Sequence, residues 1–388
     1  MKSTTRRWVK AYALEGRKHR RGMDGHIPLA RPSWTEEMRV AAMATLDSGQ
    51  WVKGPHGRAF ADEFAQYCNV SYAAPCNSGS GALIAALRLL DIGRGDEVIV
   101  PSMTFIATAT SVSMVGATPV FADVDADYWC LDVEDVAKRI TKNTKAVIGV
   151  HLFGQSYDSK LIELCEEKNL GLIEDAAQAH GTSITINGQK RMAGSLGDIA
   201  CFSFFPSKNM AVGGEGGMIT TNDQAIGNRM RSIINHGRDG TLQSQEVGTN
   251  MRMSEVFAAI GRKQLEHLDH WLEIRRNTAE QYTQALEHHQ LITAPIVFPD
   301  SEHGWHQYCV KVNDAERFID YMAEHNIVAR VFYSTPCHQH PVYATHPQNS
   351  ETLEVTESIC TRLVAVPIHH GLTDEERRKV ASALEHYA

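Results

Sequence analysis

Lys208 and Asp175 are the two residues of this sequence whose surroundings most clearly suggest chemistry. Lys208 follows an apolar run that includes Phe204 and Phe205, and a glycine cluster at 213–217 comes soon after it. Burial among apolar side chains disfavours the charged ammonium, so it lowers the pKa of a lysine and makes its amine a better nucleophile. Asp175 ends an apolar run typical of a buried strand. Ligands of α/β sheets bind at the carboxyl ends of strands, although an aspartate there can also simply cap a helix.

A serine-glycine turn at 78–81 is the third feature. It lies between a strand-like run and a helical pattern. Its backbone N–H groups and hydroxyls are therefore expected at the positive end of the dipole of the helix that follows. Such a turn suits a phosphate. It lacks the spacing of a nucleoside triphosphate loop and of a dinucleotide fingerprint. Taken alone, it is explained equally well by a tight turn with a helix cap.

Together, the three features match the needs of pyridoxal phosphate. This cofactor requires an amine for its aldehyde, a carboxylate at its pyridine nitrogen and hydrogen-bond donors for its phosphate. A carboxylate at Asp175 would keep the ring nitrogen protonated, and the protonated ring accepts electrons when a Cα proton leaves. Lys208, displaced by the substrate amine, would then move that proton as general base and acid.

The elements that must position these residues alternate along the chain. Seven strand-like runs are expected, separated by helical patterns at 81–90, 104–115 and 158–168; the strands are 70–74, 96–101, 119–123, 145–151, 171–175, 198–205 and 217–221. Strands that alternate with helices predict an α/β fold with a mostly parallel sheet sandwiched by helices.

A smaller C-terminal α+β domain is expected after this pattern ends. A long helix is predicted over 255–289, followed by strands at 306–312 and 328–333 and helices at 315–325 and 373–387, the last opened by a capping box. The predicted division is a basic extension at 1–24, a flexible segment by its composition, a large cofactor-binding domain at 25–260 and a small domain at 261–388.

Composition excludes several classes of function. The chain has 388 residues and a net charge of −8, which gives no general electrostatic case for nucleic acid. No apolar run approaches the roughly 20 residues that span a bilayer. The eight cysteines form no CxxC pair, which indicates reduced thiols in a cytoplasmic protein. The 19 histidines show no HExxH spacing, so no metal site is expected.

The chain resembles the DegT/StrS-type sugar aminotransferases, a branch of the fold-type-I enzymes that use pyridoxal phosphate. The resemblance covers the sequence from residue 27 to the end. It is carried by motifs in order: IPLARPS (27–33), WVKGP (51–55), NSGSGAL (77–83), VPSMTF (100–105), EDAAQAHG (174–181), SFFPSKN (203–209), GEGG (214–217) and NMRMSE (250–255).

The resemblance implies a role for each matching residue. Lys208 would be the Schiff-base lysine, Asp175 the partner of the pyridine nitrogen and Gln178 the donor to the phenolic oxygen of the cofactor. The remaining cofactor residues would be Phe105, which stacks on the ring, and the phosphate binders Gly79, Ser80 and Ser203. The family usually has threonine where Ser80 stands, and serine keeps the hydroxyl. An ordinary core phenylalanine is the alternative for Phe105.

Asn250 matches the residue that reaches the cofactor phosphate of the neighbouring subunit, so the resemblance implies a homodimer with composite sites. It places Trp51, Lys53 and His338 near the substrate, although Trp51 is large and apolar enough for the core. His180 is expected to make a structural hydrogen bond rather than to act in catalysis. Glu215 is expected to be exposed.

The implied function is transfer of an amino group from L-glutamate or L-glutamine to a keto-sugar linked to a nucleotide, for amino-sugar and polysaccharide biosynthesis. A cyclitol (inosose) aminotransferase is the alternative. A sugar dehydratase of the same family carries histidine in place of the lysine, so Lys208 disfavours it. A cofactor-binding regulator without turnover is a further alternative, against which the intact Lys208, Asp175 and Gln178 count.

Overall fold

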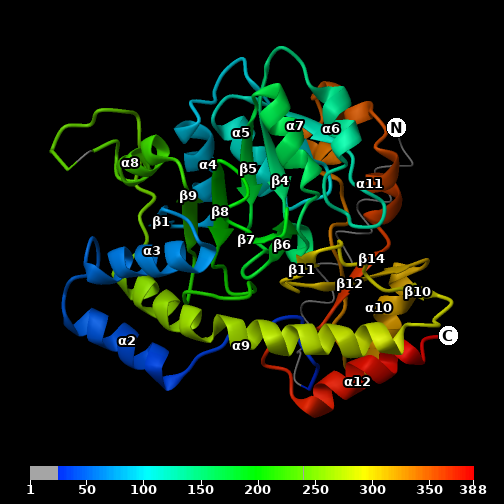
Figure 1. Cartoon of the computed structure of the whole chain (residues 1–388). Helices are drawn as coiled ribbons and strands as arrows, with labels where there is room; N and C mark the ends of the chain where they lie inside the picture. The colour runs from blue at the N-terminus through cyan, green and yellow to red at the C-terminus, as the bar shows by residue number, and fades with distance from the viewer. Residues whose placement is uncertain (1–24, 239) are drawn as a thin grey trace.

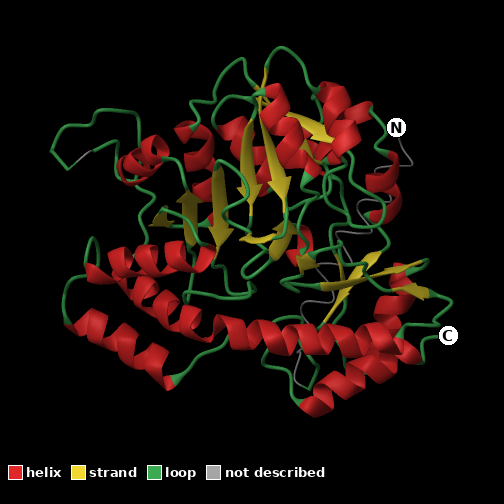
Figure 2. Cartoon of the chain, in the orientation of Figure 1, coloured by secondary structure: helices red, strands yellow, loops and turns green. Residues whose placement is uncertain are grey.

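The computed structural model describes residues 25–238 and 240–388, so the predicted basic extension at 1–24 lies outside the described residues. Figure 1 labels the elements and Figure 2 colours them by type. The helices are α2 Glu36–Asp47, α3 Pro55–Cys68, α4 Gly79–Leu89, α5 Ala107–Met114, α6 Val133–Arg139, α7 Lys160–Lys168, α8 Gln224–Ile233, α9 Glu255–Ala285, α10 Ala315–Glu324, α11 Glu354–Ile359 and α12 Asp374–Glu385.

A seven-stranded sheet forms the centre of the larger part. Its strands lie in the order β1-β9-β8-β5-β4-β2-β3, and they are β1 Tyr72–Cys76, β2 Glu97–Pro101, β3 Thr118–Ala122, β4 Thr144–Val150, β5 Gly171–Asp175, β8 Ile199–Ser203 and β9 Gly217–Thr221. Only β9 runs against the others, since it pairs antiparallel with both β1 and β8. The predicted mostly parallel α/β sheet is confirmed.

Helices cover both faces of this sheet. On one face, α4, α5 and α8 pack on a core that includes Ile148, Ile173 and Ile199. On the other face, α3 packs on Ala200 and Phe202 at one side, and α6 and α7 pack on the β4–β5 side. Successive residues of a strand point to opposite faces, so a strand covered on both sides is apolar throughout. This explains why these strands read as continuous apolar runs.

The C-terminal part contains a four-stranded sheet, in the order β10-β12-β14-β13. These strands are β10 Ile292–Thr293, β12 Tyr308–Val312, β13 Arg330–Val331 and β14 Leu363–Val366. The capping box predicted for the last helix is present, because Thr373 and Glu376 cap each other's backbone N–H groups. The strand expected at 328–333 is limited to two residues, and β14 was not predicted at all.

Helix α9 joins the two parts, and Figure 1 shows it running beneath both of them. It passes without a break through residues 260 and 261, where the sequence predicted a domain boundary. Ile27 pairs with Ile327 of the C-terminal part and packs in its core. The division into two domains at that position stays a prediction.

Other elements also differ from the sequence prediction. The helix expected at 104–115 begins only at Ala107, and residues 102–106 form a loop at the end of β2. Helix α8 was not predicted, nor was the small sheet of β6 Ser183–Ile186, β7 Gln189–Met192 and β11 Ser301–Glu302. All eight cysteines are buried and free. The described part of the chain has no helix long and apolar enough to cross a membrane.

Candidate active site

The carboxyl edge of the large sheet brings the predicted residues together. Strand β5 ends at Asp175 and its parallel neighbour β8 ends at Ser203. Helix α4 begins beside them at Gly79, where a Cβ atom would lie 2.7 Å from the Cβ of Ser203. Glycine is therefore required at position 79, because any other residue would push the helix away from the strand.

Asp175 is 6% exposed and its carboxylate is held by two donors. Thr108 of α5 donates from its hydroxyl to Oδ2 at 2.8 Å, and the backbone N–H of Ala177 donates to Oδ1 at 3.2 Å. Burial raises the pKa of Asp175, while these two hydrogen bonds and the charge of Lys208 act in the opposite direction. The result is a fixed carboxylate in a site of low polarity, which suits a partner for a protonated ring nitrogen.

Lys208 lies in the long connection between β8 and β9. Its backbone N–H donates to the carbonyl of Phe205 at 2.8 Å. Burial lowers the pKa of its amine to about 8, and the carboxylate of Asp175 opposes that shift. The sequence predicted a partly buried lysine with a lowered pKa, and Lys208 is indeed partly buried. At neutral to mildly alkaline pH a useful fraction of the amine is therefore uncharged and nucleophilic.

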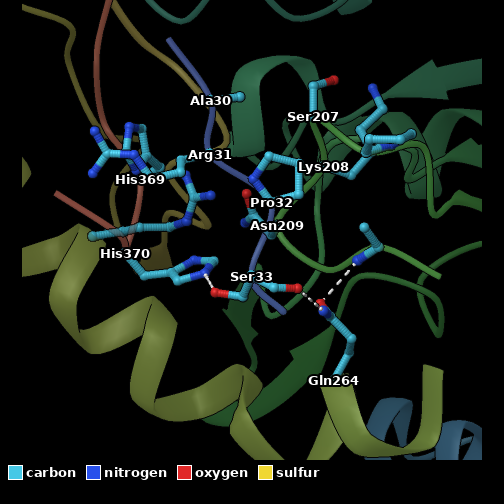
Figure 3. A pocket seen from close by; sticks show the side chains of 13 residues that line it. Ala30, Arg31, Pro32, Ser33, Ser207, Lys208, Asn209, Gln264, His369 and His370 are labelled. Carbon is cyan, nitrogen blue, oxygen red and sulfur yellow. Dashed lines mark hydrogen bonds between the residues drawn. The ribbon is translucent and has the colours of Figure 1, made fainter. Parts of the chain in front are cut away.

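The backbone of the Lys208 loop is tied to neighbouring segments. Figure 3 shows a small pocket lined by Lys208, by residues 30–33 and by His369 and His370. Gln264 of α9 crosses this pocket: its Oε1 accepts from the N–H of Ala211 and its Nε2 donates to the carbonyl of Ser33, both at 3.0 Å. Helix α9 thus fixes both the N-terminal segment and the lysine loop.

The turn before α4 has the features expected of a phosphate cradle. Ser78 is the N-cap of the helix, and its Oγ accepts from the N–H of Gly81 at 3.0 Å. The first N–H groups of a helix have no acceptor inside the helix, so the turn can offer donors to an anion. Ser80 is exposed at this end, and Ser203 is 9% exposed beside it. Gly217 lies against this turn, since its Cβ would meet the Ser78 carbonyl oxygen at 2.4 Å.

Gln178 is buried and its carboxamide is oriented by two contacts. Its Oε1 accepts from the backbone N–H of Phe153 at 2.8 Å, and its Nε2 donates to the hydroxyl of Tyr333 at 3.0 Å. Tyr333 belongs to the C-terminal part of the chain, after β13. Gln178, which the sequence predicts to donate to the phenolic oxygen of the cofactor, therefore has an amide group of fixed orientation.

Three other predicted site residues, one expected at the cofactor ring and two at the substrate, are much more exposed. Phe105 is 55% exposed in the loop before α5, so it is not the ordinary core phenylalanine that the sequence also allowed. Trp51 is 57% exposed, which excludes the core alternative, and its indole N–H donates to the carbonyl of Leu46. Lys53 is exposed in the same loop. The stacking of Phe105 on the cofactor ring and the contact of Trp51 and Lys53 with substrate stay predictions.

His338 differs from these residues because it is buried, with 0% exposure. Its Nδ1 lies 2.6 Å from Oγ of Ser102 and its Nε2 lies 3.5 Å from a carboxylate oxygen of Glu357. This environment favours a role in fixing segment 333–338 on the loop after β2. The substrate contact that the resemblance implied for His338 stays an untested prediction, and this geometry gives it no support.

His180 and Glu215 were also singled out by the sequence. His180 is 1% exposed and packs on Phe202 and Phe204, with ring centroids 5.4 and 5.5 Å apart. Burial lowers its pKa to about 3, so the ring is neutral. This packing agrees with a structural rather than a catalytic role, although within the described residues no hydrogen bond to its side-chain nitrogens is present. Glu215 is exposed, as predicted.

Asn250 is exposed and follows the long loop after α8, which projects from the body of the molecule in Figure 1. The next residue, Met251, accepts at its carbonyl from the N–H of Asn77 at 2.7 Å. Leu242 and Val247 of the loop are 89% and 76% exposed. The predicted reach of Asn250 into a second subunit is untested.

Thr108 and Tyr333 are the two site residues for which the sequence gave no role. Thr108 lies on α5, three residues after Phe105. A polar residue at that spacing could have indicated a second side chain directed toward the site. Tyr333 comes from a distant segment, and only the tertiary structure places it beside Gln178. Within residues 25–238 and 240–388, no group of three His, Cys, Asp or Glu side chains could hold a metal ion.

The arrangement fits pyridoxal phosphate. A lysine amine of lowered pKa, a buried carboxylate and a held amide donor lie at one sheet edge, beside a helix N-terminus. Close packing of Gly79 and Gly217 leaves the backbone of the turn free to approach a phosphate. Each part of the cofactor has a residue of the right chemistry to receive it.

Known proteins are similar to this chain over most of its length. Residues 32–385 match the DegT/DnrJ/EryC1/StrS aminotransferase family. A UDP-N-acetyl-3-dehydro-alpha-D-glucosamine 3-aminotransferase of Acidithiobacillus ferrooxidans is 38% identical over 90% of this chain and 93% of its own length. A dTDP-3-amino-3,6-dideoxy-alpha-D-galactopyranose transaminase of Aneurinibacillus thermoaerophilus is 38% identical over 91% of this chain and 96% of its own.

A solved structure agrees with these relatives. The crystal structure of DesV from S. venezuelae, in complex with a ketimine intermediate, superposes with a TM-score of 0.87 and 36% identity, over 90% of this chain and 93% of that one. Since the match covers nearly the whole chain, the family resemblance seen in the sequence is confirmed. The chain is a pyridoxal phosphate-dependent aminotransferase and belongs to the DegT/DnrJ/EryC1/StrS aminotransferase family.

Proposed function

We propose that this aminotransferase moves an amino group from L-glutamate or L-glutamine to the keto group of a nucleotide-linked deoxysugar. The observation that carries the proposal is the partly buried amine of Lys208, which interacts electrostatically with the buried carboxylate of Asp175. The names of the relatives supply the substrate class, because they are transaminases of UDP- and dTDP-linked sugars.

Asp175 and Lys208 have different roles in the proposed reaction. The bound cofactor supplies an electron-accepting ring that makes a proton at the amino-bearing carbon removable. Asp175 holds a proton at the ring nitrogen, because its ionised carboxylate is fixed by Thr108 and the N–H of Ala177. The amine of Lys208 removes a proton from the amino-bearing carbon of the donor. In the second half of the reaction it delivers a proton to the sugar carbon that gains the amino group. A pKa of about 8 suits both tasks near neutral pH.

The substrate side of the site supports a large second substrate. Trp51 is more than half exposed and Lys53 is exposed, while the cofactor residues Asp175 and Gln178 are buried. A sugar joined to a nucleoside diphosphate needs such an open approach, and exposed aromatic faces suit sugar and base rings. The product would be an amino-sugar for polysaccharide or related glycan assembly.

A homodimer with composite sites is part of the proposal. Asn250 is exposed at the base of a projecting loop, and several apolar side chains of α2 and the following segment are exposed, namely Val40, Met43, Leu46 and Val52. Exposed apolar side chains gathered on one segment are typical of an interface. A second copy of the chain would cover them and bring its Asn250 to the neighbouring phosphate cradle. A cytoplasmic location is the expectation that fits a biosynthetic role.

An inosose aminotransferase is the alternative within the same chemistry, and nothing in the cofactor residues separates the two. A panel of nucleotide-linked keto-sugars and inososes, scored by mass spectrometry for gain of an amine, distinguishes them. Parallel reactions with glutamate and glutamine identify the donor. We expect amine gain on a nucleotide-linked keto-sugar. Amine gain on inososes alone would replace this proposal with the alternative. Retention of cofactor with no half-reaction on either donor would instead indicate a regulator.

A further inference from the structure

Gln178 and Tyr333 form a contact between the two parts of the chain at the cofactor site. The Nε2 of Gln178 donates to the hydroxyl of Tyr333 at 3.0 Å. Gln178 comes from the segment after β5 of the large sheet, whereas Tyr333 follows β13 of the C-terminal sheet. Their contact therefore joins a residue at the ligand edge of the large sheet to a segment that lies 155 positions later in the sequence.

The orientation of the Gln178 carboxamide follows from its other partner. Nitrogen and oxygen of an amide are exchanged by a simple flip, so their positions must be inferred from the contacts. The backbone N–H of Phe153 can only donate, and it lies 2.8 Å from one of the two atoms, which must be Oε1. The other atom is Nε2, and it has hydrogens to offer to Tyr333 and to the cofactor pocket.

The Tyr333 hydroxyl is itself held in place. Its segment is pinned on the loop after β2, because the N–H of Cys337 donates to the carbonyl of Ser102 at 2.7 Å and His338 contacts the Ser102 hydroxyl. The ring of Tyr333 lies 6.3 Å, between centroids, from both Phe105 and Phe153. Burial raises the pKa of Tyr333 above its usual value, so the hydroxyl keeps its proton at working pH.

We propose that Tyr333 is a positioning residue: its hydroxyl holds the carboxamide of Gln178 so that Nε2 faces the phenolic oxygen of the bound cofactor. The inference rests on the proposed role of Gln178 and adds to it. It also gives the C-terminal part of the chain a direct influence on the cofactor, because displacement of segment 333–338 would release the amide.

A donor at the phenolic oxygen stabilises the negative charge there. It thereby favours the unprotonated form of the cofactor linkage at Lys208 and lowers the pKa of that linkage. Loss of the Tyr333 hydroxyl would weaken the donor. We therefore expect the Tyr333→Phe variant to raise this pKa by about 0.5 to 1 pH unit and to weaken cofactor binding roughly threefold to tenfold.

The test is an absorbance titration of the reconstituted protein against pH, together with cofactor titration of the apoprotein by fluorescence. It uses four proteins: the unmodified chain, Tyr333→Phe, Gln178→Ala and the double variant. If Tyr333 acts through Gln178, the double variant shifts the absorbance midpoint no further than Gln178→Ala alone. Tyr343→Phe is the matched control, because its hydroxyl contacts Ser113 and lies in the same C-terminal segment.

Two results would overturn the inference. One is an unchanged midpoint in Tyr333→Phe, and the other is additive shifts, which would mean that Tyr333 acts on the cofactor without Gln178. Tyr333→Leu replaces Tyr333→Phe if that variant proves unstable, as judged by its melting temperature against Tyr343→Phe. Failure of the proposed function looks different, since the unmodified protein would then show absorbance from cofactor bound at Lys208 but no amine gain on a nucleotide-linked keto-sugar.

Discussion

The two sides of the active site differ in how completely one chain builds them. Asp175 and Gln178, on the cofactor side, are 6% and 4% exposed, and each has two hydrogen-bond partners, all from distant segments except the neighbouring backbone N–H of Ala177 that bonds Asp175. Trp51, on the substrate side, is 57% exposed, and Lys53 of the same loop is exposed as well. The comparison teaches that a single chain is sufficient to fix the residues expected to meet the cofactor ring, whereas the substrate side remains open to a substrate and the phosphate cradle remains open, as we propose, to Asn250 of a second subunit.

Burial explains this difference in physical terms. A charged group in a low-dielectric site is stable only when its partners are fixed, so the cofactor side must be complete before any ligand arrives. Aromatic side chains that are to contact a large polar substrate gain their burial only on binding. The following experiments test each side in turn.

The largest effect is expected from Lys208→Ala, on the cofactor side. Without the amine no group can move the proton, so we expect transamination to fall by at least about 10⁴-fold. Amine gain measured by mass spectrometry gives the rate, and calorimetry checks the fold. Lys190→Ala is the control, since Lys190 is an exposed lysine paired with Glu302. Substantial residual turnover in Lys208→Ala would show that another base acts.

Asp175→Asn tests the second member of the pair while keeping its shape. The amide cannot hold a proton at the ring nitrogen, so kcat is expected to fall by roughly 10²- to 10⁴-fold. The variant also removes the charge that raises the pKa of Lys208, so that pKa should fall below about 8. The pH dependence of cofactor capture by the apoprotein measures this change. A shift toward higher pH would contradict our account of the pair.

Subunit mixing tests whether a second subunit completes the phosphate cradle. Lys208→Ala and Asn250→Ala proteins are each expected to be inactive or nearly so, and they are mixed under conditions that allow exchange. If Asn250 acts across the interface, a mixed dimer has one site with both lesions and one with none. Random exchange would then restore about a quarter of the normal sites. No recovery despite proven exchange would mean that Asn250 serves its own subunit.

Thr108→Val is expected to give the smallest effect. It removes the 2.8 Å hydrogen bond that lowers the pKa of Asp175, so that pKa rises further above its usual value. Because the ionised carboxylate is the active form, the acid limb of the kcat profile should move to higher pH, and kcat at neutral pH should fall about tenfold. Thr110→Val is the control, since Thr110 bonds only a carbonyl of its own helix. If the acid limb of the kcat profile does not move, Thr108 contributes to packing only and does not affect the pKa of Asp175.

The sequence alone was sufficient for the fold class and for the cofactor, and it placed the residues that we propose to hold that cofactor at one edge of the sheet. Long apolar runs alternating with helical patterns predict a buried parallel sheet, and the ends of two such runs, Asp175 and Ser203, fall at the ligand edge by the geometry of that sheet. The partly buried environment of Lys208 was also readable, because its apolar neighbours are close in sequence.

Only the tertiary structure decided which partners hydrogen-bond to these residues and which of the residues are exposed. Thr108 meets Asp175 across 67 positions and Tyr333 meets Gln178 across 155, and no local pattern encodes contacts of that range. The same limit explains His338: its motif resembles a substrate segment, but packing against Ser102 buries it. Local sequence determines residue chemistry and element type, whereas partners and exposure depend on how distant segments pack together.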